Sequence, residues 1–147
     1  MDDTVFEIRH VRAADKTAWT ALDKHISHAQ FDCKVRDKQG YIISVGGRIV
    51  GILRYNLFWD TVPFCTLLYI SAQHRGKGYG RALTSFWENE MSRLGYDRSL
   101  VSTQSDETAQ NFYRAAGYCD CGYLIAPDQA AELFLCKKVG IANCSAK

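Results

Sequence analysis

The sequence predicts a single α/β domain, and three observations lead to this fold class. The chain has 147 residues, which suits one domain with a sizeable core. Hydrophobic residues make up 47% of the chain and charged residues 23%, as in ordinary globular proteins. Segments with strand-like alternation are interleaved with segments whose apolar residues recur at helical spacing, which favours a sheet covered by helices. We therefore expect one domain over residues 1–147, with its core at about 5–139 and a tail at 140–147.

Charge and cysteine usage limit the partners. A net charge of +2 is too small to indicate nucleic-acid or membrane binding. The acidic start Met1-Asp2-Asp3 lacks the apolar segment of a signal peptide, and no apolar run approaches the ~20 residues that span a bilayer. The cysteines and histidines have no metal-site spacing, so we expect six free thiols and no metal. We therefore expect a cytoplasmic protein without a nucleic-acid or membrane partner, and a homodimer is compatible with the sequence.

The N-terminal part of the chain predicts strands and two helices. Apolar and polar residues alternate in the first segment, and the next carries Ala14, Ala18, Leu22 and Ile26 four residues apart. The pair Gly46-Gly47 is typical of a two-residue type I′ hairpin turn. The expected elements are a strand at 6–11, a helix at 13–26, a short helix within 27–39, and strands at 41–45 and 48–57.

The C-terminal part continues this alternation. Residues 64–70 are nearly continuously apolar, so we expect a strand that is buried on both faces. A helix follows from about Arg81 to Leu94, with Gly95 just past its end. We then expect a strand at 98–103, a helix capped by Ser105 that ends at Gly117, and strands at 118–125 and 132–139. The first turn of that helix would hold Asp106 and Glu107, and its inward face would hold Ala109, Phe112, Tyr113 and Ala116.

One loop, Arg75-Gly76-Lys77-Gly78-Tyr79-Gly80, stands between the apolar strand and a helix. Its three glycines let a ligand approach the backbone closely, and a helix N-terminus favours an anion. These features predict a phosphate-binding turn. A Walker loop is excluded because Gly78 follows Gly76-Lys77 and no hydroxyl is placed for magnesium. A dinucleotide fingerprint is excluded because Arg81 stands where the third glycine is required.

The loop does meet a third pattern, [QR]-x-x-G-x-[GA], through Arg75, Gly78 and Gly80. A second segment, Asp106-x-x-Ala109-x-x-x-Tyr113-x-x-x-Gly117-Tyr118, follows about thirty residues later. Together these segments resemble the two motifs of the GNAT superfamily of acetyl-CoA-dependent N-acetyltransferases. The resemblance covers essentially the whole chain.

This resemblance implies a fold, a donor and a set of binding residues. The fold would be a mixed, mostly antiparallel central sheet, splayed between its fourth and fifth strands and flanked by about four helices. The acyl donor would be acetyl-CoA. Backbone groups of Leu68 and Ile70 would bind the pantetheine arm, and Tyr113 would lie near the thioester sulfur. Asp106 stands where the family often has Asn. The residues of the loop would hold the pyrophosphate, namely Arg75, Gly76, Lys77, Gly78, Tyr79 and Gly80.

The expected reaction is direct attack of a primary amine, from a small molecule or a peptide, on the thioester. The family often supplies a general base from a glutamate on the fourth strand, but Thr66-Leu67-Leu68-Tyr69 contains no carboxylate. Asp60 is the nearest candidate base and Tyr113 the candidate proton donor, although a turn role for Asp60 and a core role for Tyr113 remain open. Tyr55, Phe58, Trp59 and Phe64 would line an acceptor pocket or pack in a hairpin. Because the strand-four carboxylate is missing, a non-catalytic acyl-CoA-binding or regulatory module is the alternative.

Overall fold

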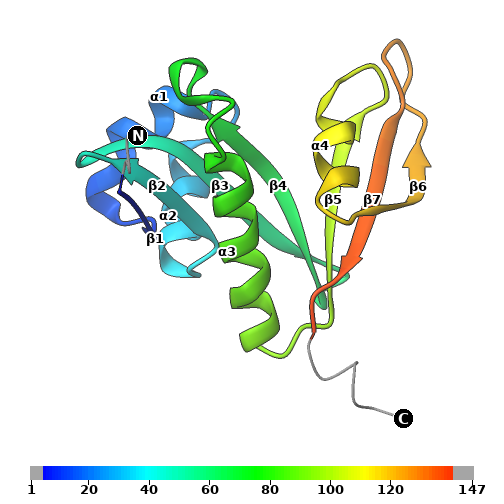
Figure 1. Cartoon of the computed structure of the whole chain (residues 1–147), viewed down its shortest axis with the longest axis horizontal. Coiled ribbons are helices and arrows are strands. Elements are labelled where there is room, and N and C mark those ends of the chain that lie inside the picture. The colour runs from blue at the N-terminus through cyan, green and yellow to red at the C-terminus, as the bar shows by residue number, and fades with distance from the viewer. Residues whose placement is uncertain (1–4, 141–147) are drawn as a thin grey trace. The chain divides into compact units, whose positions relative to one another are not determined.

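The structure, a computed structural model, describes residues 5–140 (Figure 1). Strands and helices alternate along the chain as the sequence predicts. Their order is β1 (Phe6–His10), η1 (Ala13–Asp15), α1 (Lys16–Leu22), α2 (His28–Arg36), β2 (Gly40–Val45), β3 (Arg48–Phe58), β4 (Val62–Ile70), η2 (Ala72–His74), α3 (Tyr79–Arg93), β5 (Arg98–Gln104), α4 (Ala109–Ala115), β6 (Cys119–Leu124) and β7 (Glu132–Lys138).

The described strands form one seven-stranded sheet in the order β1-β2-β3-β4-β5-β7-β6. The strands β1, β2 and β3 pair antiparallel in sequence, and β7 pairs antiparallel with both β5 and β6. The parallel pair is β4 with β5, through Phe64 opposite Leu100 and Cys65 opposite Val101. The predicted mixed, mostly antiparallel sheet with four α-helices is therefore confirmed.

The chain divides into two compact units, and each contributes strands to the sheet. Among the described residues, the first unit contains 5–55 and 67–87, and the second contains 56–66 and 88–140. The elements β3, β4 and α3 run from one unit into the other. The core of the first unit is a cluster of fully buried apolar side chains, which are Val11, Trp19, Phe31, Ile42 and Ile52.

The helix predicted at 13–26 is interrupted, because α1 ends at Leu22. The side chain of Asp23 accepts hydrogen bonds from Trp19 Nε1 at 3.1 Å and from the His25 N–H at 3.1 Å. The Asp23 carboxylate therefore binds one group within α1 and one group just beyond its end. Trp19 is the buried residue of α1, whereas Ala14 and Ala18, which belong to the series of apolar residues four apart, are exposed.

The helix predicted to begin at Ser105 starts later, with Thr108 as its N-cap. Residues 105–108 form a turn, in which the Glu107 N–H donates to Gln104 O at 3.0 Å. No acid lies in the first turn of α4, so the predicted placement of Asp106 and Glu107 was wrong. The predicted end is confirmed, because Gly117 follows the helix with a φ of +99°.

Two other turn predictions are confirmed. Gly46 and Gly47 have φ values of +58° and +79°, as a type I′ hairpin turn requires. Gly95 has a φ of +96° just past α3. The strand β4 is less buried than predicted, because only Pro63 and Cys65 among its residues are fully buried.

The remaining sequence predictions concern thiols, metals and membranes. The free cysteines are Cys33, Cys65, Cys119, Cys121 and Cys136, and Cys144 lies outside the described residues. Within residues 5–140, no group of histidine, cysteine, aspartate and glutamate side chains has a metal-binding arrangement. None of the described helices has the length and apolar character that crossing a membrane requires.

Candidate functional site

The connection from β4 to α3 carries the predicted phosphate loop, and all of it belongs to the first unit. After the turn η2, Arg75 folds back on the strand. Its Nε donates to Ile70 O at 2.8 Å, and its guanidinium lies 5.1 Å from the centroid of the Tyr69 ring. These contacts hold the start of the loop against the end of β4.

Two glycines of the loop adopt backbone conformations that other residues avoid. The φ value is +74° at Gly76 and +87° at Gly78. A Cβ at either position would meet nothing within 4 Å, so the backbone angle and not crowding requires glycine. The open space beside both residues leaves the main chain accessible to a ligand. Such a cradle fits the pyrophosphate that the resemblance assigns to it.

The helix α3 begins at Tyr79, two residues earlier than predicted. Its first described backbone bond runs from the Ala82 N–H to Gly78 O at 3.0 Å, so the amides before Ala82 have no acceptor within the helix. These amides and the helix dipole favour an anion at this end. Three exposed basic side chains, those of Arg75, Lys77 and Arg81, add positive charge.

The strand β4 precedes this loop, with the turn η2 between them. Leu68 and Ile70, which the resemblance assigns to the pantetheine arm, are both half-buried. The carbonyl of Ile70 already accepts the hydrogen bond from Arg75. A carbonyl has a second lone pair, so the contact with Arg75 does not exhaust its capacity to bind a ligand.

Tyr113, the candidate proton donor, lies in α4 of the second unit. Its side chain is 7% exposed and forms a hydrogen bond with the Cys65 thiol on β4. Burial, and then the Cys65 thiol, raise the pKa of the Tyr113 phenol well above its ordinary value. The phenol is therefore neutral at physiological pH and can donate a hydrogen bond.

A buried polar network supports the ring of Tyr113. The ring of Tyr118 packs edge-on against it, with centroids 5.6 Å apart. The Tyr118 hydroxyl donates to Glu88 Oε2 at 2.8 Å and accepts from Ser99 Oγ at 2.9 Å. Lys137 Nζ donates to the other oxygen of Glu88 at 2.9 Å. Burial, and then the charge of Glu88, raise the pKa of Tyr118.

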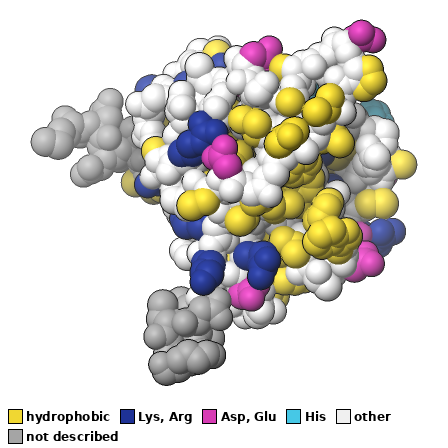
Figure 2. Space-filling view, turned by 90° about the vertical axis from the view of Figure 1, so that its right-hand side faces the viewer, with side chains coloured by type: hydrophobic (Ala, Val, Ile, Leu, Met, Phe, Trp, Pro, Cys, Tyr) yellow, Lys and Arg dark blue, Asp and Glu magenta, His cyan; other side chains and the backbone are white. Residues whose placement is uncertain are grey.

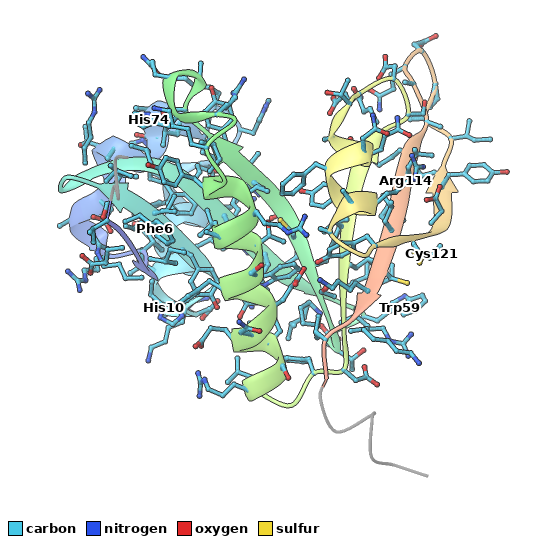
Figure 3. The ribbon with its side chains drawn as sticks, viewed as in Figure 1. Phe6, His10, Trp59, His74, Arg114 and Cys121 are labelled. Atoms are coloured by element: carbon cyan, nitrogen blue, oxygen red, sulfur yellow. The ribbon has the colours of Figure 1, made fainter. Side chains whose placement is uncertain are left out.

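The weaker candidates lie at exposed turns. Trp59 and Asp60 join β3 to β4 with φ values of 53° and 62°, and both are exposed. Figure 3 labels Trp59. Phe58 and Phe64 pack edge-on at 6.2 Å beside this turn. Asp106 is exposed in the turn before α4.

Tyr55 does not belong with these aromatic residues. Its side chain is 5% exposed in the first unit and packs on Tyr41 and Trp87, with ring centroids 6.2 Å and 5.9 Å away. A residue on a hairpin strand gives no sequence signal of which face it occupies unless the register is known.

Sequence reasoning missed the contact between Tyr113 and Cys65 and the network around Glu88. Glu88 and Tyr118 are thirty residues apart, and Glu88 and Lys137 are forty-nine apart. The one available signal was Glu88 itself, an acid adjoining Trp87 on the apolar side of a predicted helix.

Comparison with known proteins identifies the class that this fold and loop define. The Acetyltransferase (GNAT) family matches residues 6–118. The chain therefore belongs to the GNAT family, and it is an acetyl-CoA-dependent N-acetyltransferase with acetyl-CoA as the acyl donor. No curated protein sequence matches the chain.

Several solved structures share the fold. The ribosomal-protein-S18-alanine N-acetyltransferase of Escherichia coli is 13% identical with a TM-score of 0.77, and the match covers 93% of this chain and 96% of that one. Ard1 from Thermoplasma volcanium is 16% identical with a TM-score of 0.81, and the match covers 90% of this chain and 97% of that one. The protein yncA from Salmonella typhimurium, solved with its cofactor acetyl-CoA, is 16% identical with a TM-score of 0.77, covering 92% and 95%. At these identities the likeness concerns the fold alone.

Proposed function

We propose that the chain transfers the acetyl group to a primary amine of a small molecule or peptide, by direct attack of the amine in a ternary complex. The loop at 75–80 carries this proposal, because Gly76 and Gly78 open the backbone in front of the α3 N-terminus. The bound donor supplies a thioester. The whole chain, residues 1–147, would act as one N-acetyltransferase domain.

Tyr113 is the proposed hydrogen-bond donor to the leaving thiolate. A phenol is ordinarily ~1.5 pKa units less acidic than a thiol, so complete proton transfer is about 2 kcal/mol uphill. The raised pKa of buried Tyr113 increases this cost. The phenol therefore acts by donating a hydrogen bond without losing its proton. To do so, its hydroxyl would turn from Cys65 toward the leaving group.

The acceptor must be deprotonated before it attacks, and its pKa determines the cost. An amine like that of lysine, with a pKa of ~10.4, costs roughly 4–5 kcal/mol to deprotonate at pH 7, whereas an α-amine near pKa 8 costs about 1 kcal/mol. Residues 66–69 of β4 offer no carboxylate. The proposed base is Asp60, acting through water. Because Asp60 is exposed at the tip of the turn, we expect acceptors whose amine is easily deprotonated. An α-amine is consistent with the alanine acceptor named for the structurally similar Escherichia coli enzyme.

The proposal also includes residues that would contact the acceptor or the donor. Phe58 and Trp59 form an exposed aromatic pair with ring centroids 4.6 Å apart, and this pair would contact the acceptor. Tyr55 would contribute through the packing of β3 because its side chain is buried. Asp106, which is exposed, would contact the donor at most at its periphery.

One observation favours a second candidate function, an acyl-CoA-binding module without turnover. This observation is the absence of a carboxylate at residues 66–69 of β4. A coupled assay of thiol release across amino acids, peptides, polyamines and aminoglycosides separates the two functions. Release with at least one amine supports the enzyme. Tight binding of coenzyme A without release for any amine supports the module.

A homodimer and a cytoplasmic location also belong to this proposal. Figure 2 shows hydrophobic side chains exposed on the side of the molecule that carries β6. Tyr123 and Leu124 on this edge strand, and Ile125 after it, are 58–76% exposed, which suits pairing with a second copy. The free thiols suit a reducing compartment. Light scattering of wild type and Leu124→Lys tests the dimer, which the lysine should dissociate.

A further inference from the structure

A cavity of about 230 Å³ lies in the first unit, beside the turn that leads into the glycine loop. Three parts of the chain line it: the end of α1, the start of β3, and the turn at 71–74. Its apolar lining comes from Leu22, Ile49 and Val50. None of the residues assigned above to the donor or acceptor lines this cavity.

Hydrogen bonds hold the wall of this cavity in place. The Ser71 N–H donates to Val50 O at 2.8 Å, which ties the turn after β4 to β3. The Ser71 hydroxyl is hydrogen-bonded to His74 Nδ1 at 2.7 Å. This bond orients the half-buried imidazole and leaves Nε2 available to a ligand. Figure 3 places His74 on the connection between β4 and α3.

The charge of the lining is positive. Arg48 and His74 contribute the titratable side chains, and no lining residue carries a carboxylate. Arg48 takes part in none of the ion pairs among the described residues. A guanidinium with unused donors binds a carboxylate through two parallel hydrogen bonds. The polar part of the cavity therefore fits a small anion.

The size of the cavity limits the ligand. A water molecule occupies about 30 Å³ in the liquid, so 230 Å³ has room for about eight water-sized groups. The aliphatic lining favours a hydrocarbon body. We propose that this cavity binds a short-chain carboxylate, whose anionic group contacts the basic side chains and whose hydrocarbon body contacts the aliphatic ones. The site is separate from the donor loop.

Nuclear magnetic resonance of the full chain labelled with ¹⁵N tests this site, with pentanoate as the probe. We expect saturable shifts of the backbone amides at 48–50 and 71–74, and at least about tenfold weaker binding of the uncharged isostere pentanamide. Arg48→Gln should weaken pentanoate binding at least about tenfold. Arg48 is exposed, so this variant should fold, and His74→Gln serves as the second variant. Lys38→Asn is the charge-matched control, since Lys38 is exposed and lies outside the lining.

Several outcomes would overturn the site. Equal binding of pentanoate and pentanamide would remove the role of charge. Shifts scattered over surface lysines and arginines, or an equal loss in Lys38→Asn and Arg48→Gln, would show non-specific attraction. Displacement of pentanoate by acetyl-CoA would assign the binding to the donor loop. Binding that persists with saturating acetyl-CoA supports the separate site, whether or not the chain transfers acetyl groups.

Discussion

Replacing Gly78 by valine tests the phosphate loop, with Gly46→Val as a matched control. Both glycines lie in the first unit with positive φ, +87° and +58°, and a Cβ at either would meet nothing within 4 Å. The folding cost of the two substitutions should therefore be similar, because it arises from the backbone conformation in both cases. A left-handed conformation costs an L-residue about 1–2 kcal/mol, and a branched side chain lies toward the upper end.

For a chain of this length we expect the melting temperature of both variants to fall by about 3–8 °C, and differential scanning calorimetry measures it. Acetyl-CoA affinity, measured by isothermal titration calorimetry, should separate them. Valine at 78 places two methyl groups in the space that the loop leaves open and distorts the donor amides, so affinity should fall at least about 100-fold, or ~2.7 kcal/mol. Gly46→Val should bind as wild type does. Wild-type affinity in folded Gly78→Val, or an equal loss in both variants, would refute the phosphate-loop assignment.

Three further predictions concern single side chains. Tyr113→Phe should lower kcat about 10²-fold with little change in acetyl-CoA affinity, because it removes a hydrogen-bond donor to the leaving group. If the variant fails to fold, Tyr113 is a core residue and not a proton donor. Burial alone would raise the pKa of Asp23, but hydrogen bonds, chiefly from Arg54, hold this pKa below its ordinary value. The ionised Asp23 therefore stabilises the fold fully above about pH 4, and this stabilisation is lost as the pH falls through the lowered pKa. Asp23→Asn should therefore lose about 3 kcal/mol of unfolding free energy at pH 7 and show a flatter acid transition in urea melts; an unchanged acid transition would contradict the ion pair. Glu88→Gln should lower the free energy of unfolding by about 2 kcal/mol, because it weakens the bond between this side chain and Lys137. A double-mutant cycle with Lys137→Met should show coupling between the two positions, and additive effects would contradict the predicted interaction.

Much of the fold follows from local patterns in the sequence. The glycine pair at 46–47 and Gly95 predict their turns because few other residues adopt positive φ at low cost. Errors arose where a side chain makes contacts distant in sequence. Asp23 ends α1 while it binds Arg54, thirty-one residues away, and no helical periodicity reveals that partner.

The same distinction applies to the candidate site. The backbone conformation of the loop at 75–80 could be predicted because its glycines are closely spaced local signals, and Gly76 and Gly78 do have positive φ. The surroundings of Tyr113 were not, because Cys65 and Tyr118 approach it through sheet register and packing. The cavity between α1, β3 and the turn at 71–74 likewise brings together segments that are far apart in sequence.

The most direct test of the central claim is acetyl transfer itself, followed by mass spectrometry of the acceptor and by thiol release in the same reaction. We expect an α-amine, offered as an amino acid or an alanine-starting peptide, to gain one acetyl group with one equivalent of thiol released. Gly78→Val should abolish both signals, and Gly46→Val should retain them. If the wild-type chain binds acetyl-CoA tightly but acetylates no amine of any class, the claim of catalysis is contradicted and the chain is an acyl-CoA-binding module.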